Sequence, residues 1–320
     1  MTKLEGLIRG TVLFRFLETK TKKIILPGFQ GVPLYDVIGF FRSQLSKTGL
    51  TERAAAISYN FIMAIPPMCL FLFSLIPHLP FIKKRVIKLQ VSQLIKDIVP
   101  AKEHNANLIE FVNGFLDNSS TGLLSFGLIL ILFFASNGMM GIMRSFNKDY
   151  IGFEKRNGLQ KRWNAIRLTI LIMLLLFATL MLLILQGTVL SWLGIKDKSL
   201  LSFIGYIRWG FILALVFYSI AFIYKYAPSV KKKWDIVSPG ALLATSLSIL
   251  ATILFSVFVN NFGKYNALYG SIGSVIVIMS IVFINSLALL IGYELNVSIH
   301  SLQHMAQQRA AAEKKELAIK

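Results

Sequence analysis

Long apolar stretches dominate the pattern of hydrophobic and polar positions along the chain. Six of them carry almost no charge: residues 54–82, 118–143, 168–195, 206–227, 236–263 and 265–293. A bilayer core about 30 Å thick is crossed by roughly 20 apolar residues of helix, and each stretch provides about that many. The stretches are continuous and rich in Leu, Ile and Phe, whereas the strands of a membrane barrel alternate polar and apolar positions. The pattern therefore predicts an all-α, polytopic membrane protein with six transmembrane helices.

Two further segments have the helical spacing of apolar residues without the length of a span. Leu34, Ile38, Phe41 and Leu45 recur at this spacing beside charged residues. This predicts an amphipathic helix that either lies on the inner membrane surface or packs as a collar beneath the bundle. Residues 83–117 carry a similar apolar stripe and are expected on the outer side. The predicted organisation is a basic cytoplasmic N-terminal region (1–50), a transmembrane domain (51–299) and a polar cytoplasmic C-terminal tail (300–320).

Proline and small residues distinguish two of the predicted spans. Pro66 and Pro67 lie near the middle of the first span, where two missing N–H donors should kink or break the helix. The fifth span begins at Ser238 and Pro239, an N-cap followed by proline at the first helical position. Small side chains then recur at every fourth position, at Gly240, Ala244, Ser248, Thr252 and Ser256. Such a face lets another helix approach closely, so we expect the fifth span to be central and not lipid-facing.

The chain is strongly basic, with 34 Lys and Arg against 15 Asp and Glu and a formal net charge of +19. Most of these cations lie in residues 1–53, 144–167, 225–235 and 294–320, which all fall on one side of the predicted spans. By the positive-inside rule this side is cytoplasmic, and both termini lie there. We therefore attribute the charge to topology and to contact with anionic membrane lipids, and we expect no nucleic-acid partner.

The residue patterns of common hydrolases and nucleotide-driven pumps are absent from the sequence. It contains no phosphate-binding GxxxxGK[ST] loop, no HExxH metal pair and no GxSxG nucleophile turn. His300 and His304 lie four positions apart on one helix face, but no third metal ligand accompanies them. The 15 acidic residues form no close cluster of the kind that two-metal nucleases need. We predict no enzymatic activity, no cofactor and no metal site, with ribonuclease as the least favoured function.

Polar residues inside apolar spans cost free energy in lipid unless they face a partner or a cavity. Glu294 is the only carboxylate within reach of a span core, and we expect it to pair with Arg144 because both fall toward the cytoplasmic ends of their helices. The pair would be either a clasp between helices or a gate. Tyr265 and Tyr269 fall at the outer end of the sixth span, where tyrosines face an amphipathic substrate, anchor the helix or form a tight turn. The candidate route or gate residues are Tyr59, Asn60, Asn137, Arg144, Tyr265, Tyr269, Asn285 and Glu294.

Several motifs together resemble the YihY/BrkB family of bacterial inner-membrane proteins over about residues 48–300. They are Ala54-Ala55-Ala56-Ile57-Ser58-Tyr59 with Pro66 and Pro67 downstream, Tyr224-Lys225-Tyr226-Ala227-Pro228, Trp234 followed by Ser238-Pro239-Gly240-Ala241, Tyr265 to Gly273 including Gly270, and Gly292-Tyr293-Glu294-Leu295-Asn296. The sequence departs from the family at Ala64-Ile65-Pro66-Pro67, where Ser-Leu before a single proline is usual. The resemblance implies a six-helix protein of the cell envelope. Some relatives carry the label ribonuclease BN, which is widely regarded as a misassignment.

The family-level associations of the resemblance point to envelope biogenesis and to the movement of lipids or glycolipids. We therefore expect a protein of the bacterial inner membrane that transports, or assists the transport of, a lipid or other amphipathic substrate. The alternative is a scaffold that assembles an envelope complex without transporting anything. The expected partners are membrane lipids with anionic heads, together with envelope proteins or further copies of this chain.

Overall fold

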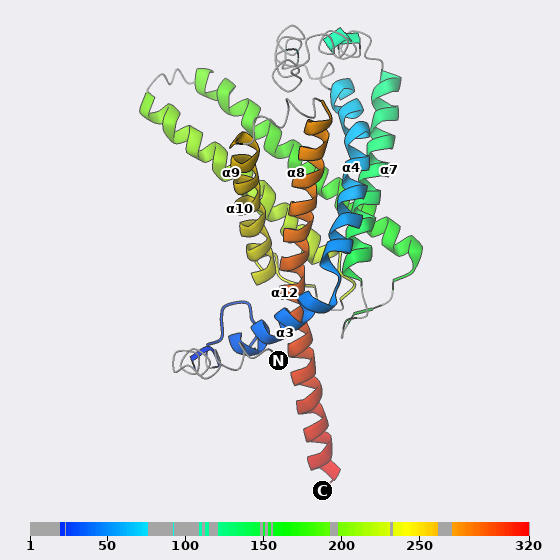
Figure 1. The fold of residues 1–320 in the computed structure, drawn as a ribbon, viewed down its shortest axis with the longest axis vertical. Helices are drawn as coiled ribbons and strands as arrows, with labels where there is room; N and C mark the ends of the chain where they lie inside the picture. The colour runs from blue at the N-terminus through cyan, green and yellow to red at the C-terminus, as the bar shows by residue number, and fades with distance from the viewer. Residues whose placement is uncertain are drawn as a thin grey trace.

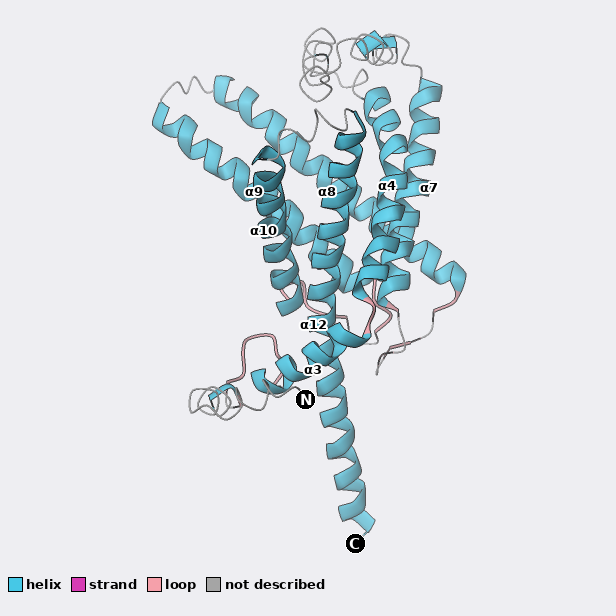
Figure 2. Ribbon diagram, viewed as in Figure 1, coloured by secondary structure: helices cyan, strands magenta, loops and turns pink. Residues whose placement is uncertain are grey.

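The regular structure of the described residues is helical, as the sequence predicts. The structure is a computed structural model, and it describes residues 20–22, 24–75, 92, 109–110, 113–114, 121–147, 150, 153–154, 156–192, 198–230, 233–261 and 271–319. The helices are α3 (Leu34–Lys47), α4 (Leu50–Leu75), α7 (Thr121–Phe146), α8 (Gly158–Trp192), α9 (Lys198–Tyr226), α10 (Pro239–Asn261) and α12 (Ser271–Ile319). Figure 2 shows these helices and the loops between them. Within the described residues, extended pairing is limited to one antiparallel bridge between Phe153 and Val230. The all-α prediction is confirmed.

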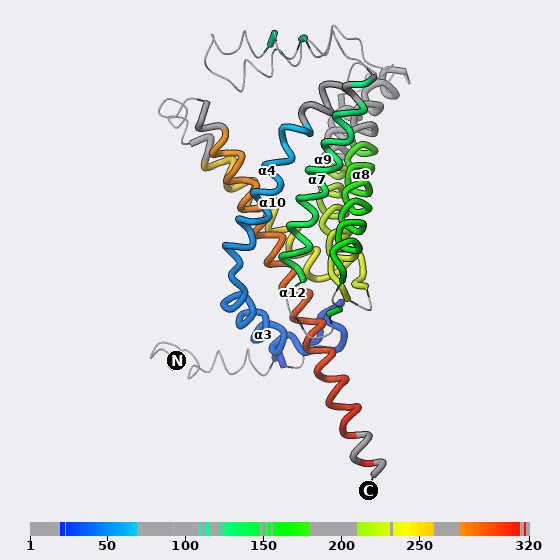
Figure 3. Tube along the Cα trace, turned by 90° about the vertical axis from the view of Figure 1, so that its right-hand side faces the viewer, coloured from blue at the N-terminus to red at the C-terminus, as the bar shows by residue number. Residues whose placement is uncertain are grey.

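Six of the helices pack as a closed ring. The principal contacts join α4 to α7, α7 to α8, α8 to α9, α9 to α10, α10 to α12, and α12 back to α4. Chain direction alternates from each helix to the next around this ring (Figure 1). At one end α4, α8 and α10 begin, and α12 continues beyond the other helices to its C-terminus; we call this the tail end. Figure 3 shows α12 leaning away from α7, α8 and α9 with distance from the tail end, so the helices converge there.

Four helices contain stretches that are long and apolar enough to cross a membrane, counted over the described residues. These stretches are Ser125–Phe146, Gly158–Thr179, Pro239–Phe258 and Val275–Glu313. They coincide with the second, third, fifth and sixth predicted spans. The described apolar part of α9 is shorter, Gly210–Tyr226. The outer segment predicted over residues 83–117 lies almost wholly outside the described residues.

The best-buried part of the bundle lies at the tail end. Ile57, Met143, Tyr224 and Leu290 come from four different helices and are each fully or almost fully buried. Away from this core the helices expose large apolar side chains. On α10 these are Leu250, Ile253, Leu254, Val257 and Phe258. Apolar surface of this extent is costly in water and favourable in lipid, which agrees with the predicted membrane location.

The predicted interruption of the first span is not a break, because α4 continues through both Pro66 and Pro67. Proline removes one N–H donor and crowds the carbonyl four residues earlier, but the other backbone bonds of the helix remain available. In a transmembrane helix, neighbouring helices help to satisfy the freed carbonyl groups. The pair of prolines therefore weakens α4 locally without ending it.

The small-residue face of α10 packs as predicted only over its first half. Gly240, Ala244 and Ser248 are buried, whereas Thr252 and Ser256 are exposed. The opposite face of α10 carries exposed leucine, isoleucine and valine side chains along the whole described helix. The expectation that this span is central and not lipid-facing is therefore wrong. A single stripe of small residues determines only which face meets one neighbour. A helix in a ring also has a face that points outward, and on α10 that face is apolar and exposed.

The helix predicted near the N-terminus is present as α3, and one of its faces packs against α12. Val37 is fully buried and joins Phe29, Val32 and Ile299 in a small apolar cluster against α12. Its neighbour Ile38 is 52% exposed. One face of α3 therefore contacts α12 below the ring, and another apolar side chain remains uncovered.

Candidate functional site

A buried ion pair joins the first turn of α4 to the middle of α12. The Glu294 side chain is fully buried, and its Oε1 accepts a hydrogen bond from Arg53 Nη1 at 2.5 Å. The same oxygen accepts a second hydrogen bond from the Tyr150 hydroxyl at 2.8 Å. Tyr150 belongs to the connection between α7 and α8. We call Arg53, Tyr150 and Glu294 the tail-end lock, because three segments far apart in sequence meet in it.

The guanidinium group of Arg53 also binds the end of α7. Its Nη2 donates to the carbonyl oxygen of Ser145 at 2.7 Å. Carbonyl groups in the last turn of a helix lack intrahelical partners and carry the negative end of the helix dipole, so a cation is favourable there. Arg53 Nε and Glu294 Oε2 are buried and have no hydrogen-bond partner among the described residues. Within that part of the chain, the lock has a donor and an acceptor that are not used.

The expectation that Arg144 forms an ion pair with Glu294 is wrong. Glu294 binds Arg53 instead, and the Arg144 side chain is exposed. The Arg144 side chain points outward, whereas the backbone carbonyl of the next residue, Ser145, faces the lock. A signal for Arg53 was present in the sequence, because this arginine directly precedes the small residues Ala54, Ala55 and Ala56 at the start of an apolar run. Of these alanines Ala54 is buried, whereas Ala55 and Ala56 are exposed, so this signal alone does not identify the partner of Glu294.

Tyr150 is held in the lock in its neutral form. Burial raises the pKa of the Tyr150 hydroxyl well above its usual range, and the adjacent Glu294 carboxylate raises it further. The neutral hydroxyl can donate to the carboxylate, as the observed hydrogen bond requires. Tyr150 therefore remains a hydrogen-bond donor throughout the physiological pH range.

Aromatic side chains surround the lock and link helices across the ring. Tyr293 stacks on Phe146 with ring centroids 3.7 Å apart, and its hydroxyl donates to the Phe146 carbonyl oxygen at 2.7 Å. The Tyr224 hydroxyl donates to the carbonyl oxygen of Leu289 at 2.5 Å. These two bonds connect α12 to α7 and to α9, which are not its main neighbours in the ring. The aromatic groups therefore fill the centre of the ring at the tail end.

Two connections between helices pair with each other beside the lock. The Glu154 N–H donates to the Ser229 carbonyl oxygen at 2.7 Å. Arg156 donates to the carbonyl oxygens of Ala227 and Pro228, at 3.2 and 2.9 Å. Burial lowers the pKa of the Arg156 guanidinium from its ordinary value. This pairing holds the connection that carries Tyr150 against the end of α9, and Pro228 takes part through its carbonyl group.

The crossing of α10 and α12 is the closest helix contact in this region. A Cβ atom added to Gly240 would overlap the Gly292 carbonyl oxygen and lie 2.6 Å from the Asn296 side chain. Asn296 Oδ1 accepts a hydrogen bond from the Gly240 N–H at 2.8 Å, and its Nδ2 donates to Ser238 Oγ at 2.9 Å. Ser238 Oγ also accepts from the Ala241 N–H at 3.3 Å, which confirms the predicted N-cap. Pro239 occupies the first helical position, as expected.

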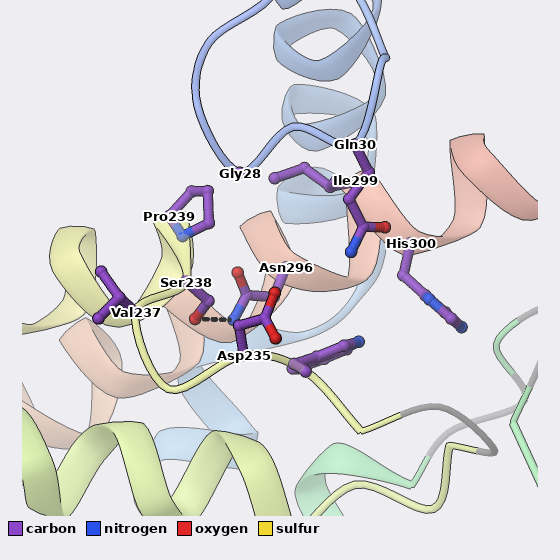
Figure 4. A pocket seen from close by; sticks show the side chains of 10 residues that line it. Gly28, Gln30, Asp235, Val237, Ser238, Pro239, Asn296, Ile299 and His300 are labelled. Carbon is purple, nitrogen blue, oxygen red and sulfur yellow. Dashed lines mark hydrogen bonds between the residues drawn. The ribbon is translucent and has the colours of Figure 1, made fainter.

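A small polar cavity of about 30 Å³ adjoins this crossing (Figure 4). A cavity of this size holds about one water molecule. Its lining includes Gln30 from the N-terminal region, Asp235 and Ser238 from the connection before α10, and Asn296 and His300 from α12. The cavity belongs to the packing of the N-terminal region on α12.

The three asparagines predicted to line a route lie at three separate helix contacts. Asn60 donates to the Ala56 carbonyl oxygen at 2.7 Å and packs against Gly141 of α7. Asn137 accepts a 2.5 Å hydrogen bond from Arg162 of α8. Asn285 donates to Thr252 of α10 at 3.3 Å. The structure therefore does not gather them into one cluster.

The remaining candidates are separated from the lock or lie outside the described part of the chain. Tyr59 is 60% exposed and faces outward from α4. Tyr265, Tyr269 and Gly270 fall outside the described residues, and Gly273 is placed only as part of α12. Within the described residues no three His, Cys, Asp or Glu side chains lie close enough to hold a metal ion. Of the predicted route residues, Glu294 alone belongs to the lock.

Comparison with known proteins identifies membrane-protein relatives over most of the chain. Residues 41–318 match the protein family described as virulence factor BrkB. The ribonuclease-like protein YfkH of Bacillus subtilis (strain 168) is 32% identical over 282 residues, which cover 85% of this chain and 98% of YfkH. The UPF0761 membrane protein NTHI0384 of Haemophilus influenzae (strain 86-028NP) is 23% identical over 274 residues, covering 84% of this chain and 96% of the relative. No solved structure matches the chain.

Proposed function

This chain belongs to the virulence factor BrkB family of membrane proteins, and we propose from that premise that it moves, or helps to move, a lipid or other amphipathic substrate across a bacterial inner membrane. The activity would be transport without covalent catalysis. The observation that carries the proposal is the tail-end lock. A buried ion pair, supported by a tyrosine, joins helices of an apolar ring at the point where the ring is most tightly closed.

The burial of two charges in this lock has a free-energy cost. Removing an arginine and a glutamate from water costs several kcal/mol for each ion, and apolar residues of similar volume often stabilise a protein as well or better. An ion pair has one property that apolar packing lacks, because it can exist in two discrete states, paired and separated. Arg53 and Glu294 are therefore suited to a gate that closes the ring at the tail end and opens during transport.

The direction of the gate follows from the charge distribution. Lys47, Arg144, Lys161, Lys225 and Lys233 all lie at or near the tail end. The positive-inside rule then assigns the tail end to the cytoplasm, together with both termini. All six ring helices, including α4 and α9, would cross the bilayer in alternating directions. The lock would face the cytoplasmic leaflet, whose anionic lipids are attracted to such cations.

Accessibility of the three asparagine positions tests whether a wet route exists. Single cysteines at Asn60, Asn137 and Asn285, each in a Cys69→Ala background, are expected to react with a membrane-impermeant thiol reagent when Tyr150→Phe weakens the lock. They should react several-fold more slowly when Tyr150 is retained. The matched control is a cysteine at Leu254, a residue exposed on the outer face of α10 that would contact lipid. This cysteine should stay unreactive both with Tyr150 and with phenylalanine in its place. Equal, negligible labelling of all four positions in both backgrounds would contradict a route.

A scaffold is the second candidate function, and the C-terminal part of α12 favours it. This helix extends well beyond the ring at the tail end (Figure 1) and so offers a long surface to a partner protein or to a second copy of the chain. In a pure scaffold the lock would be a permanent clasp. The cysteine experiment distinguishes the two functions, because a permanent clasp gives the asparagine positions no second, accessible state.

A further inference from the structure

An aromatic ladder runs along the outer face of α9. Tyr218, Phe222 and Tyr226 follow one another at intervals of four residues, and each pair of neighbouring ring centroids is 6.2 Å apart. Tyr218 is 44% exposed and Tyr226 is 37% exposed. At a helical rise of about 1.5 Å per residue, the ladder is about 12 Å long. That length is close to the hydrocarbon depth of one leaflet, which is about 15 Å.

Two lysines lie over the ring of Tyr226, which is the ladder residue nearest the tail end. The ammonium group of Lys233 is 4.9 Å from the centroid of the Tyr226 ring, and that of Lys225 is 5.9 Å from it. Lys225 comes from the last turn of α9, whereas Lys233 comes from the connection before α10. The described residues provide neither lysine with an ion-pair partner. Two like charges thus lie near one ring.

We propose that this face of α9 binds a phospholipid with an anionic head group. The phosphate group would lie beside Tyr226 and contact the ammonium groups of Lys225 and Lys233, and one acyl chain would lie along Tyr218, Phe222 and Tyr226. A phosphate near this ring is attracted to both ammonium groups and can accept a hydrogen bond from each. The aromatic rings present apolar surface at the depth that the first part of an acyl chain occupies.

The combination of charge and ladder selects a lipid over a soluble anion. A free phosphate would use the two lysines but would leave the exposed rings of Tyr218 and Tyr226 without an occupant. The proposal uses the membrane placement of the tail end from the proposed function, but it does not require that the chain transports anything. A site on the outside of the ring serves equally for a bound structural lipid and for a lipid waiting to enter a route.

Photolabelling of the full chain in nanodiscs tests the site. The probe is phosphatidylglycerol with a diazirine in one acyl chain, in a background of phosphatidylcholine. Labelling should map to the α9 peptide that contains Phe222. It should fall about tenfold or more in the double variant Lys225→Gln/Lys233→Gln, because this variant removes both cations that attract the anionic head group. The matched control is Lys47→Gln/Lys161→Gln, which removes two other tail-end cations and should label like the unchanged chain.

Three results would overturn the proposal. Equal loss of labelling in the control variant would mean that overall charge, and not this site, attracts the lipid. Labelling of α9 that the Lys225/Lys233 variant leaves unchanged would mean that the lysines do not hold the head group. Full displacement of the probe by soluble glycerol phosphate at equal concentration would mean that the ladder contributes nothing and that the site takes a free anion. Failure of lipid transport in liposomes would leave this experiment unaffected, so the two proposals fail separately.

Discussion

Replacing Glu294 with alanine is expected to destabilise the protein by about 3–5 kcal/mol, among the largest effects available to a single side chain. The substitution removes the carboxylate but leaves the Arg53 guanidinium buried without its counter-charge. It also removes the acceptor of the Tyr150 hydroxyl. Thermal unfolding in detergent micelles, followed by loss of the monodisperse species on size exclusion, gives the measurement.

Two further variants make this prediction specific to the lock. The double variant Arg53→Met/Glu294→Met should be clearly less destabilised than the sum of its single variants, because it removes both charges together. Arg144→Ala should change stability by less than about 0.5 kcal/mol, since its side chain is exposed. If Arg144→Ala destabilised the protein more than Arg53→Met does, the assignment of Arg53 as the partner of Glu294 would be wrong.

A methyl group added at the α10–α12 crossing is expected to have a comparable effect. Gly292→Ala would bring a Cβ atom within 2.6 Å of the Ala244 Cβ and 2.7 Å of the Tyr224 hydroxyl, and into overlap with the Gly240 carbonyl oxygen. Backbone cannot yield as a flexible side chain can, so we expect a loss of about 3 kcal/mol or more, at the upper end of overpacking effects. The yield of folded protein and its thermal midpoint in detergent measure the loss.

Gly210→Ala is the matched control for this crossing. Gly210 lies in α9, and a Cβ atom added there would meet nothing within 4 Å. Alanine is the better helix former by up to about 1 kcal/mol, so this variant should be as stable as the unchanged chain or slightly more stable. Equal tolerance of Gly210→Ala and Gly292→Ala would show that α10 and α12 do not cross as closely as the structure has them.

The sequence predicted the elements of the fold far better than the contacts between them. Apolar runs longer than a bilayer is thick have few alternatives to helix, because lipid offers no partners to an unpaired backbone. Ser238 and Pro239 likewise mark a helix start through local chemistry alone. These features depend on residues close together in sequence, so a single chain was enough to find them.

The partner of Glu294 could not be predicted in this way. Arg53 and Arg144 both fall near the same end of the predicted bundle, and the choice between them depends on how α4 and α7 are rotated about their axes. Tyr150 was missed because it lies in a connection between helices, where no periodic pattern indicates direction. The same limit explains the error on α10, since its small residues indicate one contact face and do not give the position of the helix in the ring.

Three of the motifs that resemble the YihY/BrkB family come together in the structure. Tyr224, Pro228, Gly240, Gly292 and Glu294 come from three of the motifs. All of them lie at the tail end, where they fill the ring centre, join the two paired connections or allow α10 and α12 to approach. Residues that look unrelated along the chain therefore build one closed region, and the lock is its polar part.

Lipid movement by the purified protein in liposomes tests the proposed transport most directly. Head-group-labelled lipids are reconstituted with the chain, and the rate at which label becomes accessible to a membrane-impermeant quencher is compared with that in empty liposomes. The unchanged chain should accelerate movement, and Tyr150→Phe should accelerate it about fivefold further, because the loss of one hydrogen bond worth about 1 kcal/mol weakens the closed lock. Folded protein that moves no lipid faster than empty liposomes, with Tyr150 or with phenylalanine in its place, would contradict the account.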